Sequence, residues 1–470
     1  MKNFKFSNYN AIKNEVKSSI WVDYILACLP IITILISCIF AIFNIYNPNF
    51  LHLYSQYTYL LVGFPLLFIA IDVCGVLLGK RRFRFNCKDF ISKYYEIIPL
   101  TICILLILIS SIVSLVLDNS LNGFTTNVSS PFVLAIGFPI ILLISMCFLF
   151  GFGVKNRNIA THEMFAVCLC STLVCVLALI DPKCELFFHK PSNIYWSSVF
   201  NNSNYFGLYL TLPTLLLAGV FAFSTSKRLA WASFCAFIVH TLVLFLVNTF
   251  SSMLAIFIAL ITLFVVDNVK NKKFSIRSTL LIITFVGMSL IVQLFASNYY
   301  SKYIGFFNEI KILASDIKNI FTDINSTLAE SAGTGRFKLF KNSVKTILQN
   351  PIFGSGNTYA NPHSAFLQLA EIWGLPCLTL LIVSIILSII KFFKYCRHFS
   401  MLSLITFFAI EGFLICSLFC SIMPHIAPLF AMISGVFCRY SNIDISKQKL
   451  QKSITTPGIV ITDQNVLNYG

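Results

Sequence analysis

Long apolar runs alternate with short polar segments along almost the whole chain. A membrane-spanning helix needs about 20 apolar residues, and a soluble domain of this size could not bury so much apolar surface. The sequence therefore predicts an all-α polytopic membrane domain over residues 1–438, followed by a polar tail at 439–470. The twelve predicted spans lie at residues 22–43, 57–79, 97–117, 132–153, 164–181, 204–223, 229–249, 251–267, 278–296, 365–390, 400–420 and 423–438.

One polar segment, residues 297–364, interrupts this pattern between the ninth and tenth predicted spans. Its first part, residues 299–330, is amphipathic and rich in aromatic residues, as in helices that lie at a membrane surface. A further helix is predicted from Gly335 to Asn350, and Pro351 ends it. We expect this segment to form a helical loop that carries the functional site.

Lysine and arginine residues orient the predicted spans, because they collect on the cytoplasmic side. With the N-terminus inside, 25 of the 34 fall in cytoplasmic segments and nine on the outer side, seven of these between residues 297 and 362. Both termini are therefore predicted to be cytoplasmic and the 297–364 loop extracytoplasmic. The net charge of +16 is then explained by topology and by attraction to anionic membrane lipid, so we expect no nucleic-acid partner.

The sixteen cysteines lie mostly within apolar runs, where a thiol behaves as a small apolar side chain. The sequence contains no CxxC pair and no Cys/His spacing typical of zinc. We therefore expect no disulfide framework, no metal and no cofactor. The first apolar run lacks a small-residue cleavage site, so we expect it to be retained as a span.

Arg336 differs from the lysines of the predicted 335–350 helix. At helical spacing, Phe337, Phe340, Val344, Ile347 and Leu348 form one apolar face. Lys338, Lys341 and Lys345 fall on one flank of that face and Arg336 on the other. A basic residue on an outer helix is usually solvated or touches lipid phosphate. A guanidinium on the inner flank would instead suit bidentate binding of a pyrophosphate.

His363 stands at the start of the tenth predicted span, after a segment rich in proline, glycine and asparagine. One interpretation is a histidine that simply lies at the membrane boundary. The other is a general base whose pKa lies near the working pH, where a sugar hydroxyl could reach it. The loop shared with Arg336 favours the second interpretation.

Other polar residues outline no transport path. Asp72, His240 and Glu411 lie inside predicted spans, where ionisable groups are functional candidates by default, but they are scattered. Asn204 leads into the sixth span, either to bind substrate or to cap that helix. A transporter for a lipid-linked sugar is the rival of another class, and it would place polar residues and broken helices at the midplane of two repeated halves.

The run Arg336-Phe-Lys-Leu, Pro351-x-x-Gly354 and His363–Ser364, followed by nine residues and Gly374, resembles the O-antigen ligase and O-antigen polymerase (Wzy-type) superfamily of bacterial envelope enzymes. Twelve spans with cytoplasmic termini agree with that family. The resemblance implies a GT-C-like, inverting, metal-independent glycosyltransferase of the inner membrane. Its donor would be a glycan on undecaprenyl pyrophosphate.

The same resemblance implies roles for individual residues. Arg336 would hold the pyrophosphate and His363 would take the proton of the acceptor hydroxyl. The expected substrate-binding residues are Lys338, Lys341, Asn204, Ser364 and Glu371. The chain departs from the family at Cys377, where Gly, Thr or Tyr is usual, and at Ser252, which aligns with a second family arginine.

The acceptor is lipid A-core sugar in a ligase of lipopolysaccharide biosynthesis, or a second lipid-linked glycan in an O-antigen or capsule polymerase. The His-Ser-x9-Gly spacing is closer to the ligase pattern. A transporter or flippase for a lipid-linked sugar stays the alternative of another class, although polarity gathered in a single loop favours an enzyme.

Overall fold

The computed structural model is all-helical in the part of the chain that it describes, where no residue lies in a strand. The predicted spans at 22–43 and 57–79, and Asp72 within the second, lie outside that part. The described residues are 91, 93–120, 138–154, 156–182, 203–299, 304–324, 326–355, 362–421 and 426–455.

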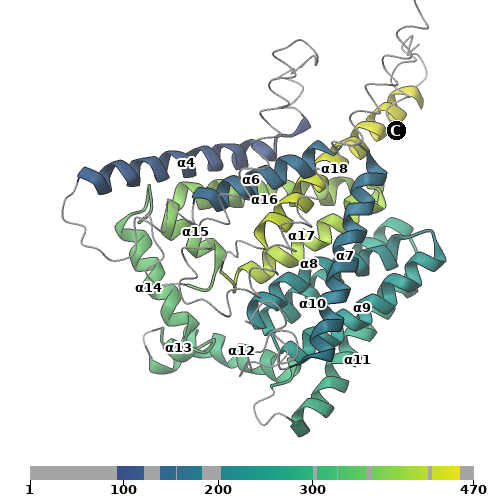
Figure 1. Cartoon of the computed structure of the whole chain (residues 1–470), viewed down its shortest axis with the longest axis horizontal. Coiled ribbons are helices and arrows are strands. Elements are labelled where there is room, and N and C mark those ends of the chain that lie inside the picture. The colour runs from purple at the N-terminus through teal and green to yellow at the C-terminus, as the bar shows by residue number, and fades with distance from the viewer. Residues whose placement is uncertain are drawn as a thin grey trace, which may run out of the picture.

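Most of the described helices pack into one bundle, and a group of shorter ones joins α11 to α16 along one side of it (Figure 1). The bundle helices are α4 (Ile97–Ser120), α6 (Phe138–Gly153), α7 (Arg157–Ile180), α8 (Ser203–Phe223), α9 (Lys227–Val247), α10 (Phe250–Asn271), α11 (Ile276–Tyr299), α16 (Leu375–Tyr395), α17 (Met401–Ser417) and α18 (Ala427–Thr455). The shorter helices are α12 (Phe306–Thr322), α13 (Thr327–Ser331), α14 (Arg336–Gln349) and α15 (Ala365–Trp373), and the 3-10 turn η3 (Cys396–His398) extends α16.

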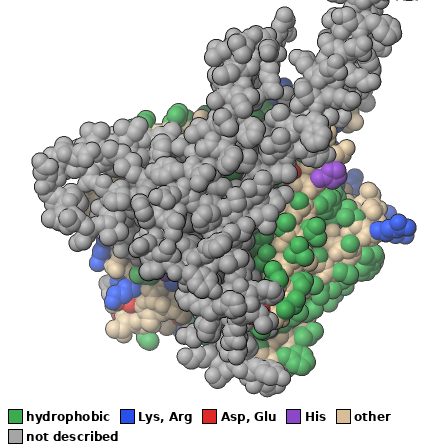
Figure 2. All heavy atoms as spheres, in the orientation of Figure 1, with side chains coloured by type: hydrophobic (Ala, Val, Ile, Leu, Met, Phe, Trp, Pro, Cys, Tyr) green, Lys and Arg blue, Asp and Glu red, His purple; other side chains and the backbone are tan. Residues whose placement is uncertain are grey.

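Six helices in the described part are long and apolar enough to cross a membrane, namely α7 to α11 and α16 with η3. The face over α7, α9 and α11 is largely hydrophobic on its surface (Figure 2). Leu169, Leu173 and Leu294 on this face are each more than half exposed. On a soluble protein such a patch would be a liability, whereas lipid accommodates it, so the chain is a membrane protein.

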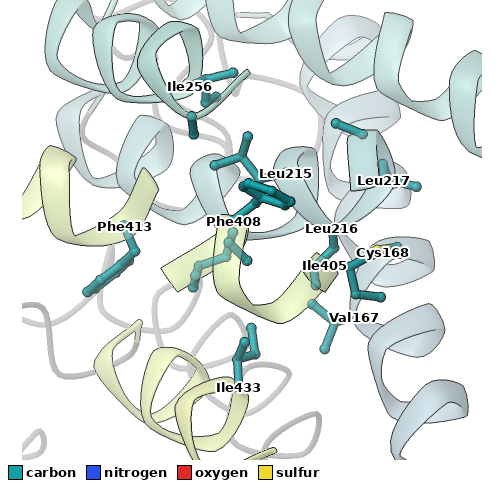
Figure 3. Close-up of a cluster of buried hydrophobic side chains, with 14 of the residues drawn as sticks. Val167, Cys168, Leu215, Leu216, Leu217, Ile256, Ile405, Phe408, Phe413 and Ile433 are labelled. Atoms are coloured by element: carbon teal, nitrogen blue, oxygen red, sulfur yellow. The ribbon is translucent and has the colours of Figure 1, made fainter. Parts of the chain in front are cut away.

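The core of the bundle is built around α8 and α17. Helix α8 is buried along almost its whole length and packs against α9, α10 and α17. Figure 3 shows Leu215 and Leu216 of α8 beside Ile405 and Phe408 of α17, with Ile256 of α10 nearby. Close packing is what holds helices together in a bilayer, so this core fixes the helix ends that frame the site.

Gly374 breaks the predicted span at 365–390 into α15 and α16. Its φ of +89° lies in the left-handed region, where only glycine is comfortable. Pro376 then occupies the first turn of α16, a position that suits proline because its missing N–H would be unpaired anyway. The prediction of one continuous helix was wrong here, since apolar composition continues through the break while the helix does not.

Helix α18 continues well past residue 438, where we expected a polar tail to begin. Polar side chains in this continuation find partners on other helices: the Tyr440 hydroxyl donates to the Val154 carbonyl at 3.1 Å, and Asp444 pairs with Arg157 at 2.7 Å. The helix therefore does not end at residue 438, and polar residues beyond that point contact other helices.

Candidate active site

Arg336 is placed by a turn of three residues in the left-handed backbone region. Gly333, Thr334 and Gly335 have φ angles of 60°, 59° and 86°. The carboxylate of Asp316 on α12 accepts a hydrogen bond from the Gly333 N–H at 2.8 Å. Helix α14 begins directly after the turn, at Arg336, so the helix predicted between Gly335 and Asn350 is confirmed.

Arg336 lies half-buried on the inward side of α14. The buried residues of this helix, Ser343 and Ile347, follow it by about two and three helical turns and so share its face. Of the predicted apolar face, Ile347 is buried, whereas Val344 and Leu348 are 44% and 68% exposed. The inward face of α14 thus contains both polar and apolar residues, with Arg336 at its N-terminal end.

His363 precedes α15 in a backbone conformation that non-glycine residues rarely adopt, with φ of +47°. Ser364 is buried and forms the N-cap of α15, where its carbonyl accepts from the Gln368 N–H at 2.9 Å. The imidazole is half-buried, and no described residue is hydrogen-bonded to it. Strained backbone of this kind concentrates at functional sites.

The structure brings Arg336 and His363 within electrostatic reach of each other. Partial burial lowers the pKa of His363 from its ordinary value of 6.5, and the positive charge of Arg336 lowers it further. The lowered pKa favours the neutral imidazole, whose unprotonated nitrogen can accept a proton. That the two residues act together in one site stays a prediction.

Glu371 connects the two helices that carry this pair. Its side chain is fully buried and accepts a hydrogen bond from the Ser343 hydroxyl of α14 at 2.9 Å. Its backbone carbonyl accepts from the N–H and the hydroxyl of Ser355, at 2.7 and 2.9 Å. We predicted a substrate-binding role for Glu371, and the structure places its carboxylate in the contact between α14 and α15.

The glycines of two sequence motifs meet at the far end of α15. A Cβ atom on Gly354 would lie 2.2 Å from the Ile372 carbonyl oxygen, and one on Gly374 would lie 2.1 Å from the Ile352 carbonyl oxygen. The Leu375 N–H also donates to the Pro351 carbonyl at 2.8 Å. The Pro-x-x-Gly turn and Gly374 are therefore two halves of one backbone junction.

Lys338 and Lys341 face α13 instead of His363. Their ammonium groups lie 3.7 and 3.6 Å from the Glu330 carboxylate, and Lys341 also donates to the Ile324 carbonyl at 3.3 Å. This contact agrees with the predicted separation of Arg336 from the lysines. Both predicted substrate-binding lysines are held by Glu330 in this structure.

The charge of Arg336 also acts on two other elements. Burial raises the pKa of Glu309 on α12, and the positive charge of Arg336 opposes that rise. Arg336 further interacts electrostatically with Cys420, which follows α17. Within the described residues, no ion pair or side-chain hydrogen bond occupies the guanidinium. Its donors are therefore available for an anion.

The N-terminal ends of α8 and α10 lie near Cys420, the residue after α17 that interacts with Arg336. The Thr249 hydroxyl before α10 donates to the Ser203 carbonyl at the start of α8, at 3.0 Å, and the Ser251 hydroxyl lies 3.6 Å from the Cys420 sulfur. Asn204 lies in the first turn of α8 rather than at its cap. Helix N-termini favour anions, which adds to the positive character around Arg336.

The resemblance seen in the sequence would place an arginine at Ser252, and the structure encloses this position within the helix packing. Its side chain is fully buried, and its hydroxyl lies 3.3 Å from the Cys416 sulfur on α17. A Cβ atom on the adjacent Gly207 would lie 2.6 Å from the Ser252 hydroxyl oxygen. No arginine could occupy this position without separating α8 from α10.

An apolar cavity of about 580 Å³ begins beside the site. Ala365 and Phe366, which directly follow His363 and Ser364, line one part of it. The rest of the wall comes from α4, α6, α16, α17 and α18, and includes Glu411. The sequence could not reveal this cavity, because residues from helices far apart in the chain form its wall.

The remaining polar residues singled out in the sequence lie away from Arg336 and His363. His240 is fully buried, with Thr172 and Thr214 hydroxyls each 3.2 Å from its ring nitrogens, so it acts as a packing residue. No three His, Cys, Asp or Glu side chains in the described part gather as metal ligands would. Sequence reasoning missed Glu309 and Asp316, although their seven-residue spacing on an amphipathic helix places both on one face.

No protein-family model matches this chain, and no curated protein is similar to it in sequence.

Proposed function

We propose that this chain is a membrane glycosyltransferase that moves a glycan from undecaprenyl pyrophosphate to a sugar hydroxyl with inversion. One observation carries the proposal: Arg336 and His363 lie at the N-terminal ends of α14 and α15, close enough for the charge of Arg336 to lower the pKa of His363. Within the described residues, no ion pair or side-chain hydrogen bond occupies the guanidinium. A base for the acceptor proton and a fixed cation for the leaving group are the two groups that this displacement needs.

In the proposed reaction, the acceptor oxygen attacks the anomeric carbon of the donor while its proton passes to a ring nitrogen of His363. The bond between that carbon and the pyrophosphate oxygen breaks on the opposite face. The electron pair leaves with the lipid pyrophosphate, and the Arg336 guanidinium stabilises the charge that develops there. Lys338, Lys341 and Asn204 would contact phosphate or sugar outside this centre, and Ser364 would hold the histidine backbone.

The proposed setting is the outer face of a bacterial inner membrane, with twelve spans in a GT-C-like arrangement and both termini cytoplasmic. The charge distribution of the sequence supports that orientation. The apolar cavity beside Ala365 and Phe366 supports a lipid-linked donor, since a polyprenyl chain needs an apolar path next to the reacting head group.

For the acceptor, we propose lipid A-core sugar, which makes the protein an O-antigen ligase of lipopolysaccharide biosynthesis. The support is the spacing from His363 through Ser364 to Gly374. The alternative is a Wzy-type polymerase, for which the acceptor is a second lipid-linked glycan. Both would use the same His363 and Arg336 chemistry.

Replacing the base tests the reaction. We expect His363→Ala to lower glycan transfer by about 10²–10⁴-fold, the usual contribution of a general base, without reducing the amount of protein in the membrane. His398→Ala is the matched control, because His398 is exposed after α16 at the opposite end of that helix. Full transfer activity in the His363→Ala variant would refute the proposal.

A deletion strain then identifies the acceptor by gel analysis of envelope glycolipid. Core without glycan, with long chains left on the carrier lipid, indicates a ligase. A single repeat unit on the core indicates a polymerase. A lipid-linked sugar transporter predicts instead that flux across the membrane is lost on deletion and is unchanged by His363→Ala.

A further inference from the structure

Asp316 contacts the turn that directly precedes α14, although it lies twenty residues before Arg336 in the sequence. Its carboxylate accepts from the Gly333 N–H at 2.8 Å. Gly333 opens the left-handed turn that ends at Gly335, and α14 starts at the next residue. The direction in which Arg336 leaves the turn therefore depends on how this turn is held.

The turn is unfavourable without support. Thr334 in its centre has φ of +59°, and a residue with a Cβ atom is strained there. Part of the support is local: the Gly335 N–H donates to the Ser331 carbonyl at 2.9 Å, and Thr334 bonds to the carbonyl of Gly333. Asp316 is the described side chain outside this segment that is bonded to the backbone of the turn.

Asp316 can act as an anchor because α12 is itself fixed to the bundle. Phe306 at the start of α12 is buried, and its ring packs against Phe245, Phe257 and Phe285 with centroids 5.7 to 6.3 Å apart. A rigid helix runs from that aromatic contact to Asp316. The turn is thereby connected to the membrane bundle.

The other carboxylates of the loop have different contacts. Glu330 lies against Lys338 and Lys341. Glu309, on the same face of α12 as Asp316, interacts electrostatically with Arg336 itself. One face of α12 thus presents a carboxylate toward the guanidinium and a second carboxylate to the backbone that positions it.

We infer that Asp316 is a positioning residue for Arg336: its hydrogen bond to Gly333 fixes the left-handed turn and so aims the guanidinium at the pyrophosphate of a lipid-linked donor. This inference rests on the proposed function for the identity of the anion. Asp316 touches no reacting atom, and its effect passes through the turn and Arg336.

The test measures binding of farnesyl pyrophosphate to the full-length protein in lipid nanodiscs. We expect Asp316→Ala to weaken the affinity about tenfold, because the charged acceptor of the Gly333 N–H is lost and the turn is released. Asp316→Asn keeps an acceptor oxygen for the Gly333 N–H, so its affinity should stay within about twofold of the wild type. Equal losses in the two variants would refute positioning through this hydrogen bond.

A double-mutant cycle with Arg336 separates positioning from a general structural effect. We expect Arg336→Ala to weaken binding at least as much as Asp316→Ala. The combination of both changes should cause no further loss, since Asp316 acts through Arg336. Additive losses would show that Asp316 acts elsewhere and would overturn the inference.

One further variant is a control and another replaces Asp316→Ala if that protein does not accumulate. Asp323→Ala removes a carboxylate from the end of the same helix, and should bind like the wild type. If Asp316→Ala fails to accumulate, Asp316→Glu decides. It keeps the charge but displaces the carboxylate by one methylene, so a loss of about threefold or more is expected, and wild-type affinity would overturn the inference.

The outcomes also separate this inference from the proposed function. If Arg336→Ala binds farnesyl pyrophosphate as well as the wild type, the pyrophosphate site itself is wrong. If Arg336→Ala weakens binding while Asp316→Ala does not, only the positioning role of Asp316 fails.

Discussion

Charged residues near α16 and charged residues in the candidate site have opposite surroundings. Helix α16 holds the first of these. At its C-terminal end, Lys391 is buried and paired with the equally buried Glu96 before α4. Asn442 of α18 donates a further hydrogen bond to that carboxylate at 3.2 Å. At the starts of α14 and α15, by contrast, Arg336 and His363 are only half-buried and lack such partners among the described residues.

This difference separates charges that hold the fold from charges that are available for chemistry. Arg157 and Asp444 repeat the first arrangement, with Ser400 and Ser403 donating to the second carboxylate oxygen at 2.8 and 2.7 Å. Each such carboxylate is paired with a basic side chain from a distant helix. Arg336 is held instead through the backbone, by the turn before it, which leaves its guanidinium open to a ligand.

The largest expected effect comes from breaking the buried pair. Lys391→Met leaves the Glu96 carboxylate buried without a counter-charge, which costs about 3–5 kcal/mol. We expect a marked drop in the unfolding temperature measured in detergent, with transfer activity per folded molecule unchanged. Lys394→Met is the matched control, since Lys394 is exposed on the same helix. Equal stability of the two variants would contradict a structural role for the pair.

A smaller effect is expected where α8 and α10 meet below the site. Gly207→Ala would place a Cβ atom 2.6 Å from the Ser252 hydroxyl and 2.8 Å from the Thr249 Cβ. Overpacking of this kind costs about 1–3 kcal/mol, again read from the unfolding temperature. Gly287→Ala is the control, because a Cβ atom there meets nothing within 4 Å. A Gly207→Ala protein as stable as that control would show that the two helices are loosely packed.

The sequence predicted much of this fold because apolar runs translate directly into helices. The run at 204–223 became α8 (Ser203–Phe223), and the run at 229–249 became α9 (Lys227–Val247). Composition alone could not predict the break at Gly374, where the left-handed backbone of one glycine ends a helix inside an apolar run. It also could not show that the polar residues after 438 are buried against distant helices.

For the candidate site, the sequence identified the residues proposed to react but not the contacts that position them. Arg336 and His363 stood out by charge type, helical phase and motif spacing. The hydrogen bond from Gly333 to Asp316 depends on how the loop folds back on α12. The sequence likewise singled out Ser252, while its burial against Cys416 depends on how α10 packs against α17.

The smallest expected effect is on the pH dependence of transfer, which tests whether the charge of Arg336 acts on His363. A general base must be deprotonated, and both burial and the charge of Arg336 lower the pKa of His363 from 6.5. Transfer should therefore decline as the pH falls, with the midpoint of the decline below 6.5. In Arg336→Gln, whose residual activity is lower, the loss of the nearby positive charge should move that decline to higher pH. The measurement is kcat/KM against pH for both proteins, and an unchanged profile in Arg336→Gln would mean that Arg336 does not act on the base.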